Sequence, residues 1–315
     1  MPRLCDDFIL LLCFMLLLCF MLVLCEDFMH SVLPQRALSW ALAFVGLTFA
    51  ACDADTTEER ARHVELHFAA MVGDLPFACG ETFVGLGTTD TSFEPMDFRL
   101  YVSAVEVRDA TGDWHPLALD QDTPWQHQGV ALLDFEDATG RCQNGTPETR
   151  TVVTGWAQDE VRGVRFEVGV PFALNHSDAS TAPSPLDQTA LFWNWLGGYK
   201  FVRLEGATTG LETGWQFHLG STGCVAGDAP GAQECAQGNR VRVEWTDFDP
   251  ATSVGLFDVA ALVRDSDLDQ HSPSTPRGCM SGPQDPDCAG IFARLGLAHG
   301  GATPGPQSFV RVGSR

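Results

Sequence analysis

The fold is organised around two stretches of sequence, GVPFALNHSDASTAPSPLDQTALFWNWLGGYKFVRLEG at residues 169–206 and GWQFHLGSTGC at residues 214–224. It contains the only lysine of the chain, Lys200, with three of the eight tryptophans and two of the nine histidines. Residues 215–219 alternate apolar and polar side chains, which is the period of a β-strand. Because so many reactive groups gather in one segment, we expect a functional site here.

Local signals in this segment predict a helix. Residues 184–187, SPLD, offer a hydroxyl cap, a proline at the first helical position and a carboxylate near the positive end of the dipole. Residues 189–196 would continue the helix, and the glycines at 197–198 would end it. Trp193 and Trp195 would then point to nearly opposite sides. Both rings can be buried only if the helix is covered on two sides, and otherwise one of them lines a site.

Short alternating runs recur along the rest of the chain. The clearest are at residues 64–68, 98–104, 164–168 and 215–219, and further strand candidates are 130–135, 200–204, 241–245 and 256–263. Clusters of Gly, Pro, Asp and Asn separate them. Many short strands with turn residues between them predict a mainly β protein, an antiparallel β-sandwich-like single domain with a few short helices, one of them at 287–297.

The N-terminal 52 residues read as a leader. The apolar run at residues 8–24 has acidic flanks, whereas a secretory peptide begins with basic residues. We therefore interpret residues 1–28 as an extension upstream of the true start, and residues 29–52 as a signal peptide of the lipoprotein type. It ends in FAAC, which makes Cys52 the lipidation candidate. The alternative is a single-span membrane anchor at residues 8–24.

Either interpretation exports the remainder of the chain, to the periplasm or to the outer membrane and cell surface. Residues 53–63 are polar and read as a tether, and residues 64–315 as the β domain. The net charge of −22 repels phosphate backbones and anionic lipids. The sequence therefore excludes nucleic-acid binding, and we expect membrane contact only through an N-terminal lipid or anchor.

Six cysteines follow the leader, an even number that fits a disulfide framework in an oxidising compartment. They are Cys79, Cys142, Cys224, Cys235, Cys279 and Cys288. Fifteen pairings are possible. Proximity in the sequence favours Cys224–Cys235 and Cys279–Cys288, which leaves Cys79–Cys142. The spacings do not match those of zinc-binding thiolates.

Two histidines of the segment are metal-ligand candidates. His218 is on the polar face of its strand, and His176 follows a strand in a loop, so the two imidazoles could form half of a copper or zinc site. The alternative is a pair of surface or hydrogen-bonded side chains. Trp125 and His127 are two residues apart, which places them on one side of a strand and makes His127 a secondary ligand candidate.

Signatures of known catalytic sites are absent. The chain has no G-x-S-x-G, P-loop, H-E-x-x-H or C-x-x-C-H motif. Two acidic stretches, at residues 133–137 and 265–269, are weak candidates for calcium. They support an alternative function as a calcium-dependent adhesion or glycan-binding surface lipoprotein. A third alternative is a hydrolase built on Asp134 and Glu136.

Several motifs, in one order along the chain, resemble the MbnP-like family, the metallo-mystery pair four-Cys motif proteins. They are FACG (77–80), GLGTT (85–89), VALLDFE (130–136), GVPF (169–172), NH (175–176), FW (192–193), GYKF (198–201) and HLGSTGC (218–224). The resemblance runs from about residue 64 to residue 297.

The resemblance implies an exported copper-binding protein with no catalysis of its own. Its implied partner is an MbnH-like di-haem enzyme of the MauG and cytochrome c peroxidase type, which oxidises a tryptophan of the copper protein to kynurenine. Opening the indole creates an amine and a ketone that can help to bind copper. The resemblance favours His176 and His218 as ligands. Trp193 and Trp195 are the first candidates for modification, and Trp125 is the next.

Overall fold

The computed structural model describes residues 61–227 and 232–315. These residues belong to one compact unit, Glu59–Arg315. The predicted leader, its Cys52 and the tether up to residue 60 lie outside the described residues. Within the described part of the chain, no helix is long and apolar enough to cross a membrane.

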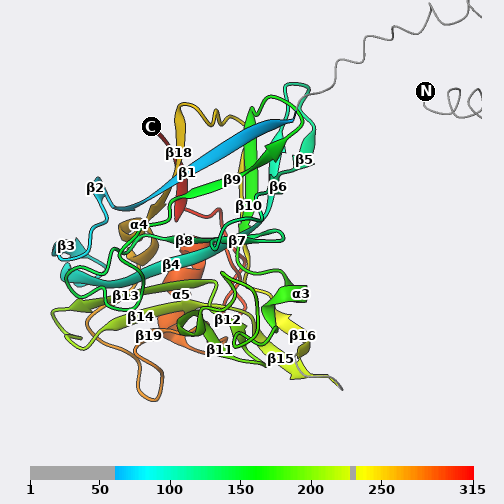
Figure 1. The fold of residues 1–315 in the computed structure, drawn as a ribbon. Helices are drawn as coiled ribbons and strands as arrows, with labels where there is room; N and C mark the ends of the chain where they lie inside the picture. The colour runs from blue at the N-terminus through cyan, green and yellow to red at the C-terminus, as the bar shows by residue number, and fades with distance from the viewer. Residues whose placement is uncertain (1–60, 228–231) are drawn as a thin grey trace, which may run out of the picture. The chain divides into compact units, whose positions relative to one another are not determined.

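Two sheets make up most of this unit (Figure 1). The first has the order β20 (Val310–Ser314), β18 (Ser253–Asp258), β1 (Arg62–Val72), β9 (Val152–Ala157) and β6 (Ala118–Leu119), with β2 (Leu75–Pro76) beside β1. The second has the order β17 (Val241–Trp245), β10 (Gly163–Val168), β4 (Thr91–Arg108), β13 (Val202–Thr208), β14 (Trp215–Leu219) and β19 (Gly278–Cys279). Strands β3 (Phe83–Leu86), β5 (Trp114–Pro116) and β8 (Val130–Asp134) also pair with β4, and β7 (Gln126–His127) pairs with β8.

Two small hairpins and short helices complete the unit. The hairpins are β11 (Phe192–Asn194) with β12 (Gly198–Tyr199), and β15 (Thr222–Ala226) with β16 (Ala232–Gln237). The helices are α3 (Phe172–Asn175), α4 (Val259–Val263) and α5 (Ala289–Leu295), with 3-10 turns η2 (Thr189–Leu191) and η3 (Pro286–Cys288). Most strand pairs are antiparallel, and β1–β18 and β14–β19 are parallel. The mainly β class with few short helices, predicted from the alternation, is confirmed.

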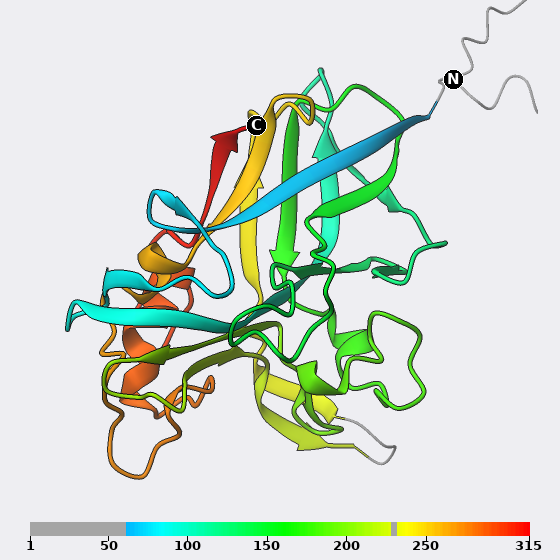
Figure 2. The same ribbon diagram turned by 60° about the vertical axis from the view of Figure 1, so that its left-hand side comes forward.

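The long strand β4 organises the second sheet, and Figure 2 shows its first part, in cyan, running below β1. The first part of β4 pairs with β13 and its last part pairs with β10, so different parts of one long strand connect these two neighbours. Near the junction Ala104 has a φ of 49°, and the register with β10 shifts between Arg165 and Glu167. Such an irregularity bends a strand and increases its twist.

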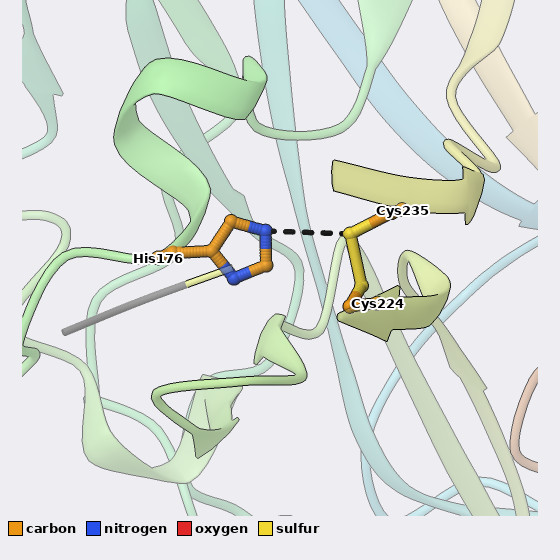
Figure 3. A group of neighbouring side chains, drawn as sticks. All are labelled: His176, Cys224 and Cys235. Atoms are coloured by element: carbon orange, nitrogen blue, oxygen red, sulfur yellow. Dashed lines mark hydrogen bonds between the residues drawn. A yellow bond between two sulfur atoms is a disulfide. The ribbon is translucent and has the colours of Figure 1, made fainter. Parts of the chain in front are cut away.

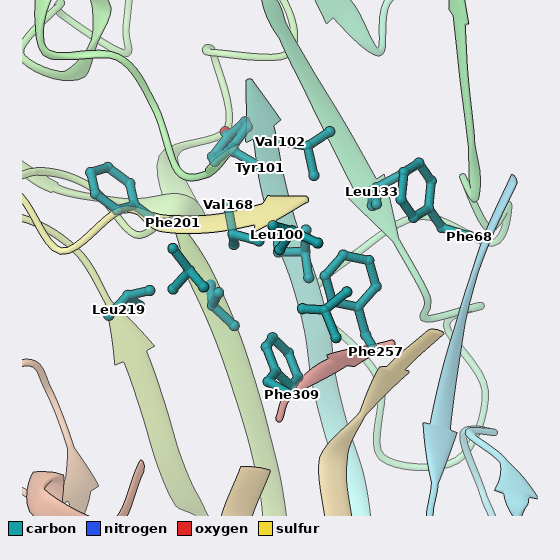
Figure 4. Close-up of a cluster of buried hydrophobic side chains, with 14 of the residues drawn as sticks. Phe68, Leu100, Tyr101, Val102, Leu133, Val168, Phe201, Leu219, Phe257 and Phe309 are labelled. Atoms are coloured by element: carbon teal, nitrogen blue, oxygen red, sulfur yellow. The ribbon is translucent and has the colours of Figure 1, made fainter. Parts of the chain in front are cut away.

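Aromatic and branched side chains from both sheets form one core (Figure 4). The Phe68 ring of β1 lies 5.6 Å from the Phe166 ring of β10 and 5.8 Å from the Phe257 ring of β18. Phe257 in turn contacts Phe309, at 5.4 Å between ring centroids. Each such side chain contributes about 1.5–3 kcal/mol on burial, so this layer holds the two sheets together.

The opposite face of β4 is buried as well. Alternation predicts a half-exposed strand there, with Arg99, Tyr101 and Ser103 facing water, yet all three are almost fully buried. The segment before β13 covers Tyr101, whose hydroxyl donates to the Pro185 carbonyl oxygen at 2.9 Å, and Glu136, after β8, lies 3.1 Å from Arg99. The prediction of a single buried face is therefore wrong for the middle of this strand, because a long connection folds back over it.

The predicted helix at residues 184–196 is wrong. The chain forms only the short turn η2 there and then extends into β11. The Asn194 Oδ1 atom accepts hydrogen bonds from the Leu196 and Gly197 N–H groups at 3.0 and 2.8 Å, which builds a turn of the Asx type. Strand pairing and this local turn override the capping signals, so Gly197 lies in the turn of a hairpin and Gly198 begins its second strand.

Elsewhere the predictions hold more closely. The helix expected at residues 287–297 is confirmed as α5, preceded by η3. The strand candidate at 256–263 is only half correct, because β18 ends at Asp258, whose carboxylate accepts from the Ala261 N–H and starts α4. All three expected disulfides are present, namely Cys79–Cys142, Cys224–Cys235 and Cys279–Cys288.

Candidate metal centre

His176 lies directly after α3, with its ring beside the Cys224–Cys235 disulfide (Figure 3). Its Nδ1 atom is 3.3 Å from the Trp195 carbonyl oxygen. Its Nε2 atom is 3.2 Å from the Asn175 side-chain nitrogen and 3.5 Å from the Cys235 sulfur. A carbonyl oxygen can only accept and an amide nitrogen can only donate. The contacts therefore fit a neutral ring with its proton on Nδ1 and a lone pair on Nε2, and partial burial lowers the pKa of this histidine.

Asn175 holds this histidine against the β11–β12 hairpin. It is completely buried, and its Oδ1 atom accepts a hydrogen bond from the Tyr199 N–H at 2.9 Å. Gly198 has a φ of 74° and lies so close to Asn175 that a Cβ at this position would overlap it. Only glycine therefore allows the hairpin to approach α3. Interpretation of the sequence missed the role of Asn175, although the Asn-His pair was part of the family motif.

The ligand atoms of His176, Cys224 and Cys235 lie within 4.8 Å of one another. Both sulfurs are joined in a disulfide, whereas the thiolate is the form of cysteine that binds metals. This group therefore offers a metal one imidazole and no thiolate.

A second group of three consists of Asp109 and His115, at the β4–β5 turn, and Asp159, between β9 and β10. Its Asp109 Oδ1 atom already accepts three backbone N–H groups of that turn, at 2.8–2.9 Å. Its Oδ2 atom lies 2.9 Å from the His115 Nε2 atom. The Asp109 carboxylate thus has a structural role in the turn.

His218 has a different environment, because it is almost fully buried in β14. Its Nε2 atom lies 2.7 Å from the Glu205 Oε1 atom, and its Nδ1 atom is buried with no hydrogen-bond partner among the described residues. Burial lowers the pKa of His218, against the opposing effect of Glu205, and it is therefore neutral near pH 7. Hydrogen bonds from His218 and Arg203 outweigh burial at Glu205 and bring its pKa to about 2. A neutral imidazole held by a carboxylate is the usual arrangement of a metal-binding histidine.

A chain of buried ion pairs continues from Glu205 across the sheet. Arg203 contacts Glu205 at 2.8 Å and Asp97 at 3.0 Å. Asp97 pairs with Arg99 at 2.6 Å, and the Arg99 Nε atom lies 3.1 Å from Glu136. Interpretation of the sequence missed this network. The signal that could have revealed it is a pair of opposite charges two residues apart inside each of two apolar strands, β4 and β13.

The acidic stretch proposed for hydrolysis lies at the end of this network. Asp134 and Glu136 are 1% and 0% exposed, so neither carboxylate is available to a bound substrate. Burial raises the pKa of Asp134 to about 6 and that of Glu136 to about 8. Gly145 packs directly on the Glu136 carboxyl group, because a Cβ at this position would overlap it.

The second acidic stretch is used by the fold. Asp265 pairs with Arg294 at 2.6 Å, and Asp267 accepts the Asp269 N–H of its own turn at 2.9 Å. Asp269 accepts hydrogen bonds from the Thr91 hydroxyl at 2.7 Å and from other donors nearby. Within the described residues, no cluster of three ligating groups includes a carboxylate of either acidic stretch.

The tryptophan candidates fall into two groups. The Trp193 ring packs on Gly220, two residues beyond His218, and a Cβ on this glycine would overlap the ring. Trp195 is 50% exposed, and its backbone carbonyl oxygen contacts His176. The hairpin therefore carries one tryptophan to the strand of His218 and another to His176.

Trp125 and His127 lie apart from this arrangement. Trp125 lies under the Arg150 guanidinium, 4.9 Å from its ring centroid, and His127 is in β7, paired with Val130. Among the described residues, no hydrogen bond, ion pair or aromatic contact links Trp125 or His127 to either candidate ligand, and none joins His176 to His218.

Together, the fold and site define a disulfide-linked β protein with a buried carboxylate–imidazole pair, and its disulfides fit an exported protein. The model of the MbnP family matches residues 61–281, and the chain belongs to this family. The solved structure of MbnP from Methylosinus trichosporium is similar, with 34% sequence identity and a TM-score of 0.73. The similarity covers 81% of this chain and 99% of that chain. No curated protein matches the chain significantly.

Proposed function

We propose that this protein is an exported copper-binding protein without catalytic activity, completed by oxidation of one of its tryptophans to kynurenine. The oxidising partner is an MbnH-like di-haem enzyme of the MauG type. Membership of the MbnP family supports the proposal. In the same proposal, Cys52 carries a lipid that anchors the chain, and the β domain faces the periplasm or the cell exterior.

The observation that carries the proposal is the unpartnered Nδ1 atom of His218. A buried polar atom without a partner is costly, and native proteins rarely leave one. Imidazole nitrogen is a good ligand for copper, and a carboxylate on the other ring nitrogen is the usual support. The chemistry of the two rings therefore supports our assignment of His218, through Nδ1, and His176, through Nε2, as imidazole ligands of the copper ion.

The proposed modification supplies ligands that the chain lacks. Two equivalents of an oxidant of the peroxide class, used by the haem partner, each transfer one oxygen atom to the indole C2–C3 bond, and each is reduced to one water. The bond breaks to give N-formylkynurenine, and water then releases the formyl carbon as formate. The product has an aromatic amine and a ketone where indole offers only an N–H donor.

The β11–β12 hairpin is the best location for the modified residue. Trp193 packs against the strand of one candidate ligand, and the backbone of Trp195 contacts the other. Trp125 has neither contact and instead pairs with Arg150. We therefore propose Trp193 or Trp195 as the oxidised residue.

The test is intact-mass and peptide analysis of the full chain, co-expressed with and without the haem partner. We expect a mass gain equal to the difference between one oxygen and one carbon atom, located in the peptide that holds Trp193 and Trp195. Copper uptake should rise with it. The proposal is wrong if every tryptophan stays intact and copper binding is the same with and without the partner. The double variant Trp193→Phe/Trp195→Phe should lose the mass gain, and Trp125→Phe should retain it.

A further inference from the structure

We propose that Glu205 is a positioning residue that fixes the tautomer of His218, so that Nδ1 is the atom that binds the metal. The inference rests on the proposed function for the identity of the metal. The tautomer itself is a property of the metal-free protein, so the two ideas can fail separately.

The hydrogen-bond chemistry around His218 defines the tautomer. An ionised carboxylate can only accept, so the Nε2 atom at 2.7 Å from Glu205 must carry the proton. The neutral ring then has its lone pair on Nδ1, the atom that is buried with no hydrogen-bond partner. Because Nε2 is already occupied, Nδ1 is the ring atom left for a ligand.

Glu205 is itself held on both oxygens. The Arg203 Nε atom donates to Oε1 at 2.8 Å, and the Nη2 atom donates to Oε2 at 3.1 Å. Arg203 also contacts Asp97, at 3.0 Å, which limits the movement of the guanidinium. The carboxylate is therefore fixed in direction, and a fixed acceptor orients the ring that donates to it.

The backbone around His218 is fixed from the other side of β14. The Ser281 hydroxyl donates to the His218 carbonyl oxygen at 2.9 Å and accepts from the Gly220 N–H at 3.1 Å. Ring and backbone thus have separate supports. A loss of Glu205 should release the ring while Ser281 still holds the strand, so its effect on the tautomer is separable from unfolding.

The first experiment uses the unmodified, metal-free full chain labelled with ¹⁵N in histidine. The two nitrogens of a neutral imidazole give well-separated ¹⁵N signals, one for the protonated and one for the bare nitrogen. We expect a single tautomer for His218, with the proton on Nε2. A proton on Nδ1 would overturn the proposal, and this measurement requires no variant to fold.

The second experiment compares Glu205→Gln with a matched control, Glu106→Gln. Glutamine still offers an acceptor to Arg203 but can also donate, so the His218 signals should shift toward a mixture of tautomers. Glu106 is a carboxylate bound by Arg165, at 2.6 Å, with no histidine in contact, and its variant should keep the wild-type spectrum.

Both variants are then co-expressed with the haem partner and titrated with Cu²⁺. We expect Glu205→Gln to bind 10–100-fold more weakly than the wild type, with an altered nitrogen pattern in the Cu²⁺ electron paramagnetic resonance spectrum. An unchanged tautomer and an unchanged affinity in this variant would overturn the role of Glu205. If the wild type shows the expected tautomer but takes up no copper, the proposed function is wrong, while the tautomer result supports the orienting role of Glu205.

Discussion

The two candidate ligands, His176 and His218, are built in opposite ways. His176 stands at the rim of the domain, half-buried, and its partners are a backbone carbonyl, an amide and a disulfide. His218 lies inside the second sheet, and its partner Glu205 belongs to a chain of buried charges on β13 and β4 that reaches Glu136, two residues after β8. One histidine is positioned by turns and close backbone approach, and the other by buried charge.

The two histidines therefore differ in how a substitution near them affects the stability of the protein. A rim site depends on residues that add little to the free energy of unfolding, so its side chains can be changed without unfolding the protein. A site supported by buried charge is tied to the fold, because removing one member leaves its partners charged and unpaired.

The largest expected effect is that of Arg99→Met. Arg99 is buried between Asp97 and Glu136, and methionine would leave the Asp97 carboxylate without this cation and the Glu136 carboxyl group without its 3.1 Å contact. Breaking such a buried network costs about 3–5 kcal/mol. Urea denaturation followed by tryptophan fluorescence measures the loss. As a control, Arg162→Met removes an exposed pair with Glu160 and should cost about 0–1 kcal/mol. Equal losses in the two variants would contradict the contrast.

The next effect concerns the contact between the hairpin and the strand of His218. In Gly220→Ala the new methyl group would overlap the Trp193 ring, and such overpacking costs about 1–3 kcal/mol. The matched control is Gly129→Ala, because a Cβ on Gly129 meets no atom within 4 Å. The free energy of unfolding and the Trp193 fluorescence should change only in the first variant. An unaltered Gly220→Ala protein would show that the ring does not pack there.

The pH dependence of stability tests the far end of the network. Asp97, Arg99, Asp134 and Arg203 face Glu136, whose pKa is raised to about 8 by burial. The folded state therefore keeps a proton that the unfolded state has lost, and stability should fall as the pH rises toward 8. The slope from this one group is up to about 1.4 kcal/mol per pH unit.

The glutamine of Glu136→Gln cannot ionise, so this variant should lose the dependence of stability on pH between pH 6 and 8. This range lies above the pKa of about 6 for Asp134. The variant should be more stable than the wild type at pH 8. Glu148→Gln, in the same loop and largely exposed, should keep the wild-type slope. Denaturation curves at several pH values decide, and identical slopes in all three proteins would exclude a protonated Glu136.

Features that depend on residues close together in the sequence were predicted correctly. Alternation in residues 164–168 and 215–219 identified β10 and β14, and short separations identified two of the disulfides. Prediction failed where distant segments meet. The contact of His218 with Glu205 depends on the register of β13 with β14, which no local pattern specifies.

The false helix at residues 184–196 has the same origin. Residues 184–187 carry side chains that commonly cap helices, and the Ser184 hydroxyl donates to Asp187 at 3.0 Å. The extended form prevailed because Phe192 pairs with Tyr199 and the hairpin packs on Asn175. These partners come from other parts of the fold, so propensity alone could not weigh them.

The smallest expected effect on stability is that of Trp195→Phe. Half of this side chain is exposed, and its contact with His176 runs through the backbone, which the substitution leaves in place. The free energy of unfolding should therefore change by no more than about 0.5 kcal/mol. Trp215→Phe, at a position only 1% exposed, is the matched control and should cost about 0.5–3 kcal/mol. A large loss in Trp195→Phe would mean that this ring belongs to the core. A negligible loss would mean that the indole of Trp195 is not required for stability, as expected of a residue with a role in the proposed oxidation.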